Sequence, residues 1–183
     1  MTHNSQTAQQ QSAVIAVAHA YLARGPAIQY DQLSMDRLLR ITPRRNRFAP
    51  PEAASGQHIL FLDCSSFVNA VYYTAFGREL PADITWDMME VMEPKLYDYS
   101  TTHRETAADR ARIRAEVFQL VRPGDCIAMR YEGNGHVVLC GERGFYYHCT
   151  EIDGGTSYRY DQRCDVFSPT GAIGREPLDT LFQ

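Results

Sequence analysis

The spacing of hydrophobic residues changes about two thirds of the way along the chain, and this change constrains the fold more than any other feature. Between Cys64 and Phe76, apolar residues recur three, four, seven and eleven positions after Cys64, the pattern of one buried helix face. Further on, β-branched and aromatic residues form short runs between glycine-containing turns, at 126–131, 136–140 and 145–150. These runs predict an antiparallel meander. A helical part followed by a sheet predicts an α+β fold.

Two further helices are expected. Ser12 can cap a helix over 12–23, which the turn at Gly25 and Pro26 would end. The stretch 105–121 has alternating charges on a helical pattern and predicts a second amphipathic helix. Two later runs can add strands to the sheet, at 157–160 and 165–168.

The composition is that of an ordinary globular domain, with 44% hydrophobic and 22% charged residues in 183. The polar residues 1–11 are expected to form a disordered leader, and 12–183 a single domain. A net charge of −4 argues against nucleic-acid binding, which usually needs a basic domain. The longest apolar run, 13–23, is too short to span a bilayer and follows no positively charged segment. Neither a membrane span nor a signal peptide is therefore predicted.

The five cysteines raise the question of what Cys64 does. They are Cys64, Cys126, Cys140, Cys149 and Cys164. Their odd number leaves at least one unpaired within the chain, and no CxxC pair indicates a structural zinc site or a redox motif. Cys64 could be a packed hydrophobe, half of a disulfide, a metal ligand or a nucleophile.

The position of Cys64 favours a nucleophile. Asp63 stands where a helix N-cap belongs and Gly77 where a C-terminal glycine belongs, so Cys64 lies in the first turn of a helix. The helix dipole and the free N–H groups there stabilise a thiolate. A nucleophilic thiol also needs a base and a partner that orients the base. His136 and His148, in neighbouring predicted strands, are the candidates.

Whether the two histidines can cooperate depends on the strand register. A two-residue turn at Glu142 and Arg143 pairs position 137 with His148 and puts the histidines on opposite faces. A three-residue loop at 141–143 sets His136 opposite His148 on one face. Both alternatives are open from the residues alone.

Three motifs, in order, resemble the NlpC-type cell-wall cysteine peptidases. DCSSF at 63–67 is similar to the DCSGF motif of that family, and RPGDCIAM at 122–129 to its GDL-plus-aromatic strand. GHVVLCGERGFYYHCT at 135–150 resembles its HVGIYLG…FIHA hairpin, including the distance between the two histidines. The likeness covers roughly 12–160.

The resemblance implies a papain-like fold, with N-terminal helices and a nucleophile at a helix N-terminus packed on a small antiparallel sheet. It makes Cys64 the nucleophile, His136 the general base and His148 the residue that orients it. Tyr30 is the best match for a tyrosine that faces the active site in the family. With Asp63, which supports the motif, and Ser65, it completes the candidate substrate-binding and oxyanion residues.

The implied activity is hydrolysis of amide bonds in bacterial peptidoglycan stem peptides. The expected scissile bond joins γ-D-glutamyl to a diamino acid, and it is cut through an acyl-enzyme without a cofactor. The partner is then peptidoglycan or a muropeptide. Such an enzyme is secreted, periplasmic or associated with the cell wall, although a cytoplasmic role stays open because no signal peptide is visible.

The chain departs from the family pattern in three places. Ser66 replaces the usual glycine, and the segments near 32–58 and 78–122 are longer than the family core. The segment 78–122 is expected either to form a lid or wall of a site or to be a helical excursion that merely packs. The arginines of 37–47 are expected to form a solvated surface, with a patch for an anionic ligand as the alternative.

Other functions compete with the hydrolase. Cys64, His136 and His148 could instead hold zinc with an open fourth position. The same fold also hosts deamidases and acyltransferases acting on other substrates. A third alternative is a non-catalytic module that binds muropeptide or a protein.

Overall fold

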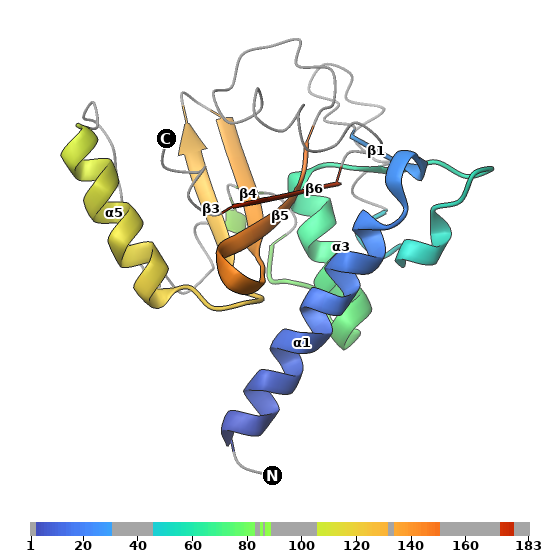
Figure 1. Ribbon diagram of the computed structural model, residues 1–183. Coiled ribbons are helices and arrows are strands. Elements are labelled where there is room, and N and C mark those ends of the chain that lie inside the picture. Colours follow the sequence, from blue (N-terminus) through green and yellow to red (C-terminus); the bar gives the residue numbers. More distant parts are fainter. Residues whose placement is uncertain are drawn as a thin grey trace.

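The computed structural model describes residues 3–30, 46–82, 85, 87–88, 106–131, 134–150 and 173–177 (Figure 1). These residues form helices, one parallel sheet and one antiparallel sheet, which agrees with the expected α+β class. The helices are α1 (His3–Leu22), α3 (Cys64–Phe76) and α5 (Ala107–Leu120), with the 3-10 turns η1 (Gly25–Ala27), η2 (Pro51–Ala53) and η3 (Glu142–Gly144). The strands are β1 (Ile28–Tyr30), β2 (Leu60–Leu62), β3 (Cys126–Tyr131), β4 (Asn134–Cys140), β5 (Phe145–Cys149) and β6 (Ile173–Pro177).

The antiparallel sheet has the strand order β3-β4-β5-β6. Its first three strands confirm the predicted meander, with ends within about two residues of the expected runs. The fourth strand, β6, is not among the predicted strands and pairs antiparallel with β5. The strands expected at 157–160 and 165–168 lie outside the described residues.

The parallel sheet brings the chain to the start of α3. Strands β1 and β2 pair with Tyr30 opposite Leu62, and Asp63 then connects β2 directly to α3. Neither of these three-residue strands is predicted by the sequence pattern. Their pairing places the end of β1 beside the residues that precede Cys64.

Helix α3 begins and ends where the sequence predicts. Asp63 is its N-cap, and its carboxylate accepts a hydrogen bond from the Ser66 N–H at 2.7 Å. The Ser66 hydroxyl in turn accepts from the Asp63 N–H at 2.7 Å, which completes a capping box. Gly77 ends the helix with φ +66°, a left-handed conformation that favours glycine. Ser66, the departure from the family motif, therefore stabilises the helix start.

The sequence predicts that residues 1–11 form a disordered leader, but residues 3–11 are helical and belong to α1. This helix begins at His3 and ends at Leu22, so Ser12 lies inside it and is not its cap. Residues 3–11 contain no glycine or proline, and their alanine and glutamines are good helix formers, so helical structure extends through them. Figure 1 shows these first turns projecting away from the rest of the chain.

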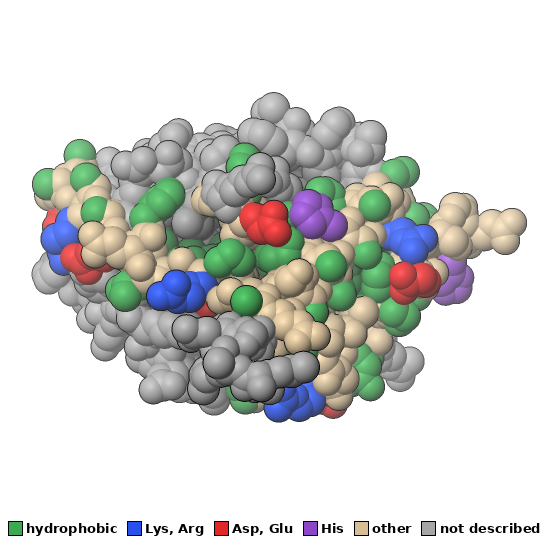
Figure 2. All heavy atoms as spheres, turned by 60° about the horizontal axis from the view of Figure 1, so that its bottom comes forward, with side chains coloured by type: hydrophobic (Ala, Val, Ile, Leu, Met, Phe, Trp, Pro, Cys, Tyr) green, Lys and Arg blue, Asp and Glu red, His purple; other side chains and the backbone are tan. Residues whose placement is uncertain are grey.

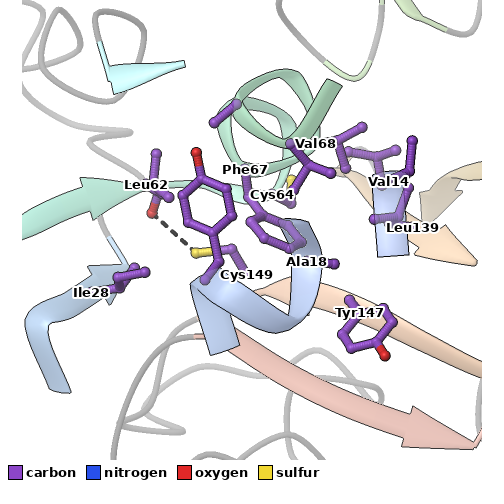
Figure 3. Packing of buried hydrophobic residues seen from close by; sticks show 14 of the residues in the cluster. Val14, Ala18, Ile28, Leu62, Cys64, Phe67, Val68, Leu139, Tyr147 and Cys149 are labelled. Carbon is purple, nitrogen blue, oxygen red and sulfur yellow. Dashed lines mark hydrogen bonds between the residues drawn. The ribbon is translucent and has the colours of Figure 1, made fainter. Parts of the chain in front are cut away.

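The core lies between the two N-terminal helices and one face of β4 and β5. Val137, Leu139 and Tyr147 are fully buried in it together with Ala18 of α1 and Val68 of α3 (Figure 3). Because side chains alternate along a strand, His136 and His148 belong to the other face of the sheet. They are buried there as well.

The described surface carries scattered charges. On the face shown in Figure 2, the Lys and Arg side chains of the described residues lie apart from one another and do not gather in one patch. Within the same part of the chain, no helix combines the length and the apolar character needed to cross a membrane.

Candidate active site

Cys64 lies at the first position of α3 and is 6% exposed. Its Sγ atom is 3.7 Å from the hydroxyl oxygen of Thr85. The backbone N–H groups of Ser65 and Val137 face the sulfur and lower the pKa of the thiol. Val137 follows His136 directly in β4, so the thiol meets the strand that carries the candidate base.

The Cys64 thiol is protonated at neutral pH in this arrangement. Burial, and after it the negative charge of Asp63, raise its pKa to about 12. The N–H groups of Val137 and Ser65 and the Thr85 hydroxyl lower it without cancelling the effect of burial. The expectation of a thiolate at the helix start is therefore wrong for this structure. Removal of water from the sulfur raises the pKa more than the helix N-terminus lowers it.

The two histidines form a hydrogen-bonded pair. Nε2 of His136 lies 3.2 Å from Nδ1 of His148, and the rings are nearly perpendicular, with centroids 5.5 Å apart. Burial lowers the pKa of His136 to about 4. Burial and then the neighbouring charge of His136 lower the pKa of His148 well below its ordinary value. Both rings are therefore neutral near pH 7, with one proton shared across the contact.

The hairpin register explains how the pair forms. Cys140 lies opposite Tyr146 and Leu139 opposite Tyr147, so even-numbered residues of both strands share a face. The same-face alternative is thus confirmed. The loop is the turn η3 at 142–144, one residue later than the expected 141–143, so the histidines lie diagonally and not directly opposite each other.

The structure joins two members of the candidate triad, His136 and His148, and leaves Cys64 without a hydrogen bond to either. The Cys64 thiol contacts Thr85, Ser65 and Val137, and among the described residues no hydrogen bond joins it to either imidazole. His136 uses Nε2 for His148, so a proton taken from the thiol would bind at Nδ1. Cys64 packs in the core with Val137, whereas His136 belongs to the other face of β4. A working contact between the thiol and the imidazole therefore requires both side chains to move.

The remaining candidates lie around the start of α3. Tyr30 is partly buried against the core, and its pairing with Leu62 places it near the approach to Cys64. The Ser65 hydroxyl donates to the Asp63 carboxylate at 2.9 Å, and Ser65 is buried. Asp63 and Ser65 therefore hold the helix start together, which is the supporting role expected of Asp63.

Sequence reasoning missed Thr85 and Asn69. Thr85 lies in the long segment 78–122, and nothing in its local pattern marks it as a neighbour of the cysteine. Asn69 is buried in α3, where its side chain donates to Ser65 and Ala82 carbonyls. A signal for Asn69 was available in the sequence, because it is a polar residue inside an otherwise apolar helix. A buried amide there needs hydrogen-bond partners, which indicates a structural role.

Two further expectations are a zinc site at the cysteine and histidines, and an arginine surface at 37–47. Among the described residues, no group of three His, Cys, Asp or Glu side chains could hold a metal ion, so this geometry does not support the zinc alternative. Of the arginines in 37–47, only Arg47 is described. Its guanidinium lies 4.4 Å from the ring centroid of Phe48 and 3.9 Å from the Glu79 carboxylate.

The arrangement combines a thiol, a neutral imidazole on β4 and a second imidazole hydrogen-bonded to the first. Such a set can perform nucleophilic attack on a carbonyl with general-base assistance. No protein-family model, curated protein or solved structure matches the chain, so its family stays a prediction from the three sequence motifs.

Proposed function

We propose that the protein is a papain-like cysteine hydrolase that cuts amide bonds through Cys64, His136 and His148. The observation that carries the proposal is the 3.2 Å contact between Nε2 of His136 and Nδ1 of His148. His136 precedes Val137, whose N–H faces the Cys64 sulfur. A buried pair of neutral histidines is useful in catalysis when one ring accepts a proton and the other ring holds the first in its orientation. Packing alone would be served equally well by apolar side chains.

The reaction starts from a neutral thiol and a neutral imidazole. His136 takes the thiol proton as the sulfur bonds to the amide carbonyl carbon, and His148 accepts the hydrogen bond from Nε2–H of the resulting imidazolium. The carbon–nitrogen bond then breaks, and His136 returns the proton to the leaving amine. Water attacks the thioester with His136 again as base, which releases the acid and restores the thiol.

The start of α3 offers the stabilising groups for the oxyanion. The N–H of Cys64 lies in the first turn, where backbone donors have no partner within the helix. In the proposal this N–H meets the oxyanion of the tetrahedral intermediate, and the Tyr30 hydroxyl assists. Asp63 and Ser65 keep the backbone of this turn in place.

The proposed substrate is a peptidoglycan stem peptide, cut between γ-D-glutamyl and a diamino acid. This part of the proposal is supported by the resemblance of the DCSSF, RPGDCIAM and hairpin motifs. It places the enzyme where that substrate is found, outside the cytoplasmic membrane or in the periplasm.

The first experiment does not require the substrate to be known. The folded protein is treated with iodoacetamide between pH 6 and 9, and each cysteine is quantified by mass spectrometry. Cys126 is half-buried and serves as the accessible reference, while Cys149 is fully buried and serves as the inert one. We expect Cys64 to react faster than Cys149 across this range, and His136→Gln to slow it about tenfold or more.

The result that would sink the proposal is clear. If Cys64 reacts as slowly as Cys149, and His136→Gln changes nothing while circular dichroism shows a folded protein, Cys64 is not an activated nucleophile. A binding module then becomes the better explanation. His136→Ala provides a second variant if the glutamine does not fit its buried site.

The second experiment tests substrate and acceptor. Stem peptides with diaminopimelate or lysine are incubated with the wild type and with Cys64→Ala, and products are identified by mass spectrometry. We expect cleavage after γ-D-glutamyl that Cys64→Ala abolishes. A parallel reaction with an added primary amine identifies an acyltransferase, because the amine would then appear in the product. Release of ammonia from glutamine peptides would instead indicate a deamidase.

A further inference from the structure

Asn69 joins two parts of the chain at the candidate site. It is 2% exposed, in α3, one helical turn after Ser65. Its Nδ2 atom donates to the Ser65 carbonyl at 3.1 Å and to the Ala82 carbonyl at 3.2 Å. The first bond holds the side chain against its own helix, and the second ties the following segment to that helix. Because both amide protons have partners, Asn69 acts as a clamp between α3 and Ala82.

Thr85 lies three residues beyond that clamp. Its side chain is 6% exposed, and its hydroxyl oxygen is 3.7 Å from the Cys64 sulfur. Met88, a further three residues on, is 1% exposed and belongs to the core. Thr85 is thus held on both sides, by a hydrogen bond before it and by a buried side chain after it. The contact with Cys64 is part of a packed arrangement and not the chance approach of a surface side chain.

We infer that Thr85 is a further residue of the active site, whose hydroxyl donates a hydrogen bond to the Cys64 sulfur as the thiol loses its proton, and that Asn69 positions it. The inference rests on the proposed function and adds to it the side-chain donor that receives the thiolate. It assigns to Ala82 and Thr85, within the segment 78–122, a place in a wall of the site.

The surroundings of Cys64 make such a donor important. Asp63, at the cap of α3, brings a negative charge that opposes a thiolate. Cys149 on β5 is a neutral thiol that donates to the Leu62 carbonyl at 3.4 Å, and Figure 3 shows this bond directed away from Cys64. On β4, His136 is neutral before it accepts the proton. Among the described residues, the donors that face the sulfur are two backbone N–H groups and the Thr85 hydroxyl.

The test compares Thr85→Val, which keeps the shape and removes the hydroxyl, with Thr85→Ser, which keeps the hydroxyl. The readout is the alkylation rate of Cys64 relative to Cys126 in the same sample, between pH 7 and 9. Losing one hydrogen bond to an anion shifts a pKa by about one unit. The thiolate that remains is more nucleophilic, with a Brønsted slope of about 0.4–0.5, so we expect Thr85→Val to slow Cys64 about threefold. Thr85→Ser should retain nearly the wild-type rate.

Asn69→Leu tests the clamp. If Asn69 acts through Thr85, it should slow Cys64 in the same direction as Thr85→Val, and the double variant should be no slower than Thr85→Val alone. A purely structural Asn69 would lower the free energy of unfolding and leave the relative alkylation rate at its wild-type value. Urea unfolding of each variant separates these two roles.

Failure of this inference differs from failure of the hydrolase proposal. If wild-type Cys64 outpaces Cys149 and depends on His136, but Thr85→Val matches Thr85→Ser, the hydrolase stands and the role of Thr85 is overturned. If Cys64 is slow throughout, the hydrolase fails, and the ratio between the two Thr85 variants still shows whether the hydroxyl acts on the sulfur. A Thr85→Val protein that reacts faster also overturns the inference.

Discussion

Nε2 of His136 and Nδ1 of His148 lie 3.2 Å apart in a buried part of the antiparallel sheet. With both rings neutral, one nitrogen of this pair must donate and the other must accept. His136 can accept a proton at Nδ1 only in the tautomer that carries a hydrogen on Nε2, so Nε2 of His136 donates and Nδ1 of His148 accepts. The contact therefore fixes the tautomer of His148 as well as the orientation of His136.

The first prediction separates orientation from packing at His148. In His148→Asn the amide oxygen can take the place of Nδ1, two bonds from Cβ, whereas His148→Gln moves its amide one bond further. A hydrogen bond to a charged group contributes about 1.5–3 kcal/mol, so we expect His148→Ala to lower kcat about 10- to 100-fold. His148→Asn should recover more of this loss than His148→Gln, as measured by kcat on the cleaved stem peptide. Equal kcat in all three variants would show that His148 does not orient the base.

The second prediction concerns stability in acid. The unfolded chain takes up a proton on His136 near its ordinary pKa of 6.5, while the folded protein resists until about pH 4. Between these values the unfolded state binds more protons, so stability falls as the pH falls. The shift corresponds to about 3 kcal/mol for His136, and His148 acts in the same direction.

Urea unfolding at pH 7 and pH 4.5 measures this loss. His136→Gln should show a clearly smaller difference in unfolding free energy between the two pH values, because glutamine does not titrate. Carboxylates contribute to both proteins alike and cancel in the comparison. An unchanged difference would mean that His136 is not the buried, neutral group described here.

The elements that could be predicted from sequence are those whose signals are local. Asp63 and Gly77 mark the ends of α3, and short β-branched runs mark β3, β4 and β5. By contrast β1, β2 and β6 are short, and their existence depends on partners that local pattern does not reveal. The hairpin loop had a usable signal, because Gly144 has φ +75° and a glycine is favoured at that position.

The sequence nominates the candidate site residues but does not reveal their protonation. Cys64, His136 and His148 were expected from spacing, cap and hairpin, and the structure places them at the start of α3, on β4 and on β5. The protonation of the thiol depends on how completely the surrounding chain removes water, which is a tertiary property. Thr85 is likewise brought to the sulfur by the clamp from Asn69, a contact between residues thirteen positions apart.

The third prediction removes the charge that opposes the thiolate. Asp63→Asn keeps an oxygen that can accept from the Ser66 N–H, so α3 remains capped. Without the carboxylate the pKa of Cys64 falls, and its alkylation at pH 8 should rise about twofold to threefold relative to Cys126. Asp125→Asn is the matched control, because Asp125 caps the turn at Arg122 and does not contribute to the pKa of Cys64. A rise in both variants, or in neither, would contradict the electrostatic role of Asp63.

The fourth prediction tests the hairpin that aligns the histidines. Gly141 donates its N–H to the Phe145 carbonyl at 2.7 Å, and a Cβ atom there would lie 2.6 Å from Cε2 of Tyr147. The Tyr147 ring cannot easily yield, because it is fully buried and its hydroxyl is 2.9 Å from Nε2 of His19. Gly141→Ala should therefore lower the free energy of unfolding by about 1–3 kcal/mol, the usual cost of overpacking.

Gly56→Ala is the control for this change, since a Cβ atom at Gly56 meets nothing within 4 Å. We expect its effect on stability to stay within about 0.5 kcal/mol. Because the η3 turn sets the register that places His136 and His148 on one face, Gly141→Ala should also perturb the imidazole nitrogen resonances of both histidines, whereas Gly56→Ala should not. If Gly141→Ala is destabilised and those resonances keep their wild-type positions, the histidine pair does not depend on the turn, and β4 and β5 hold their register by packing alone.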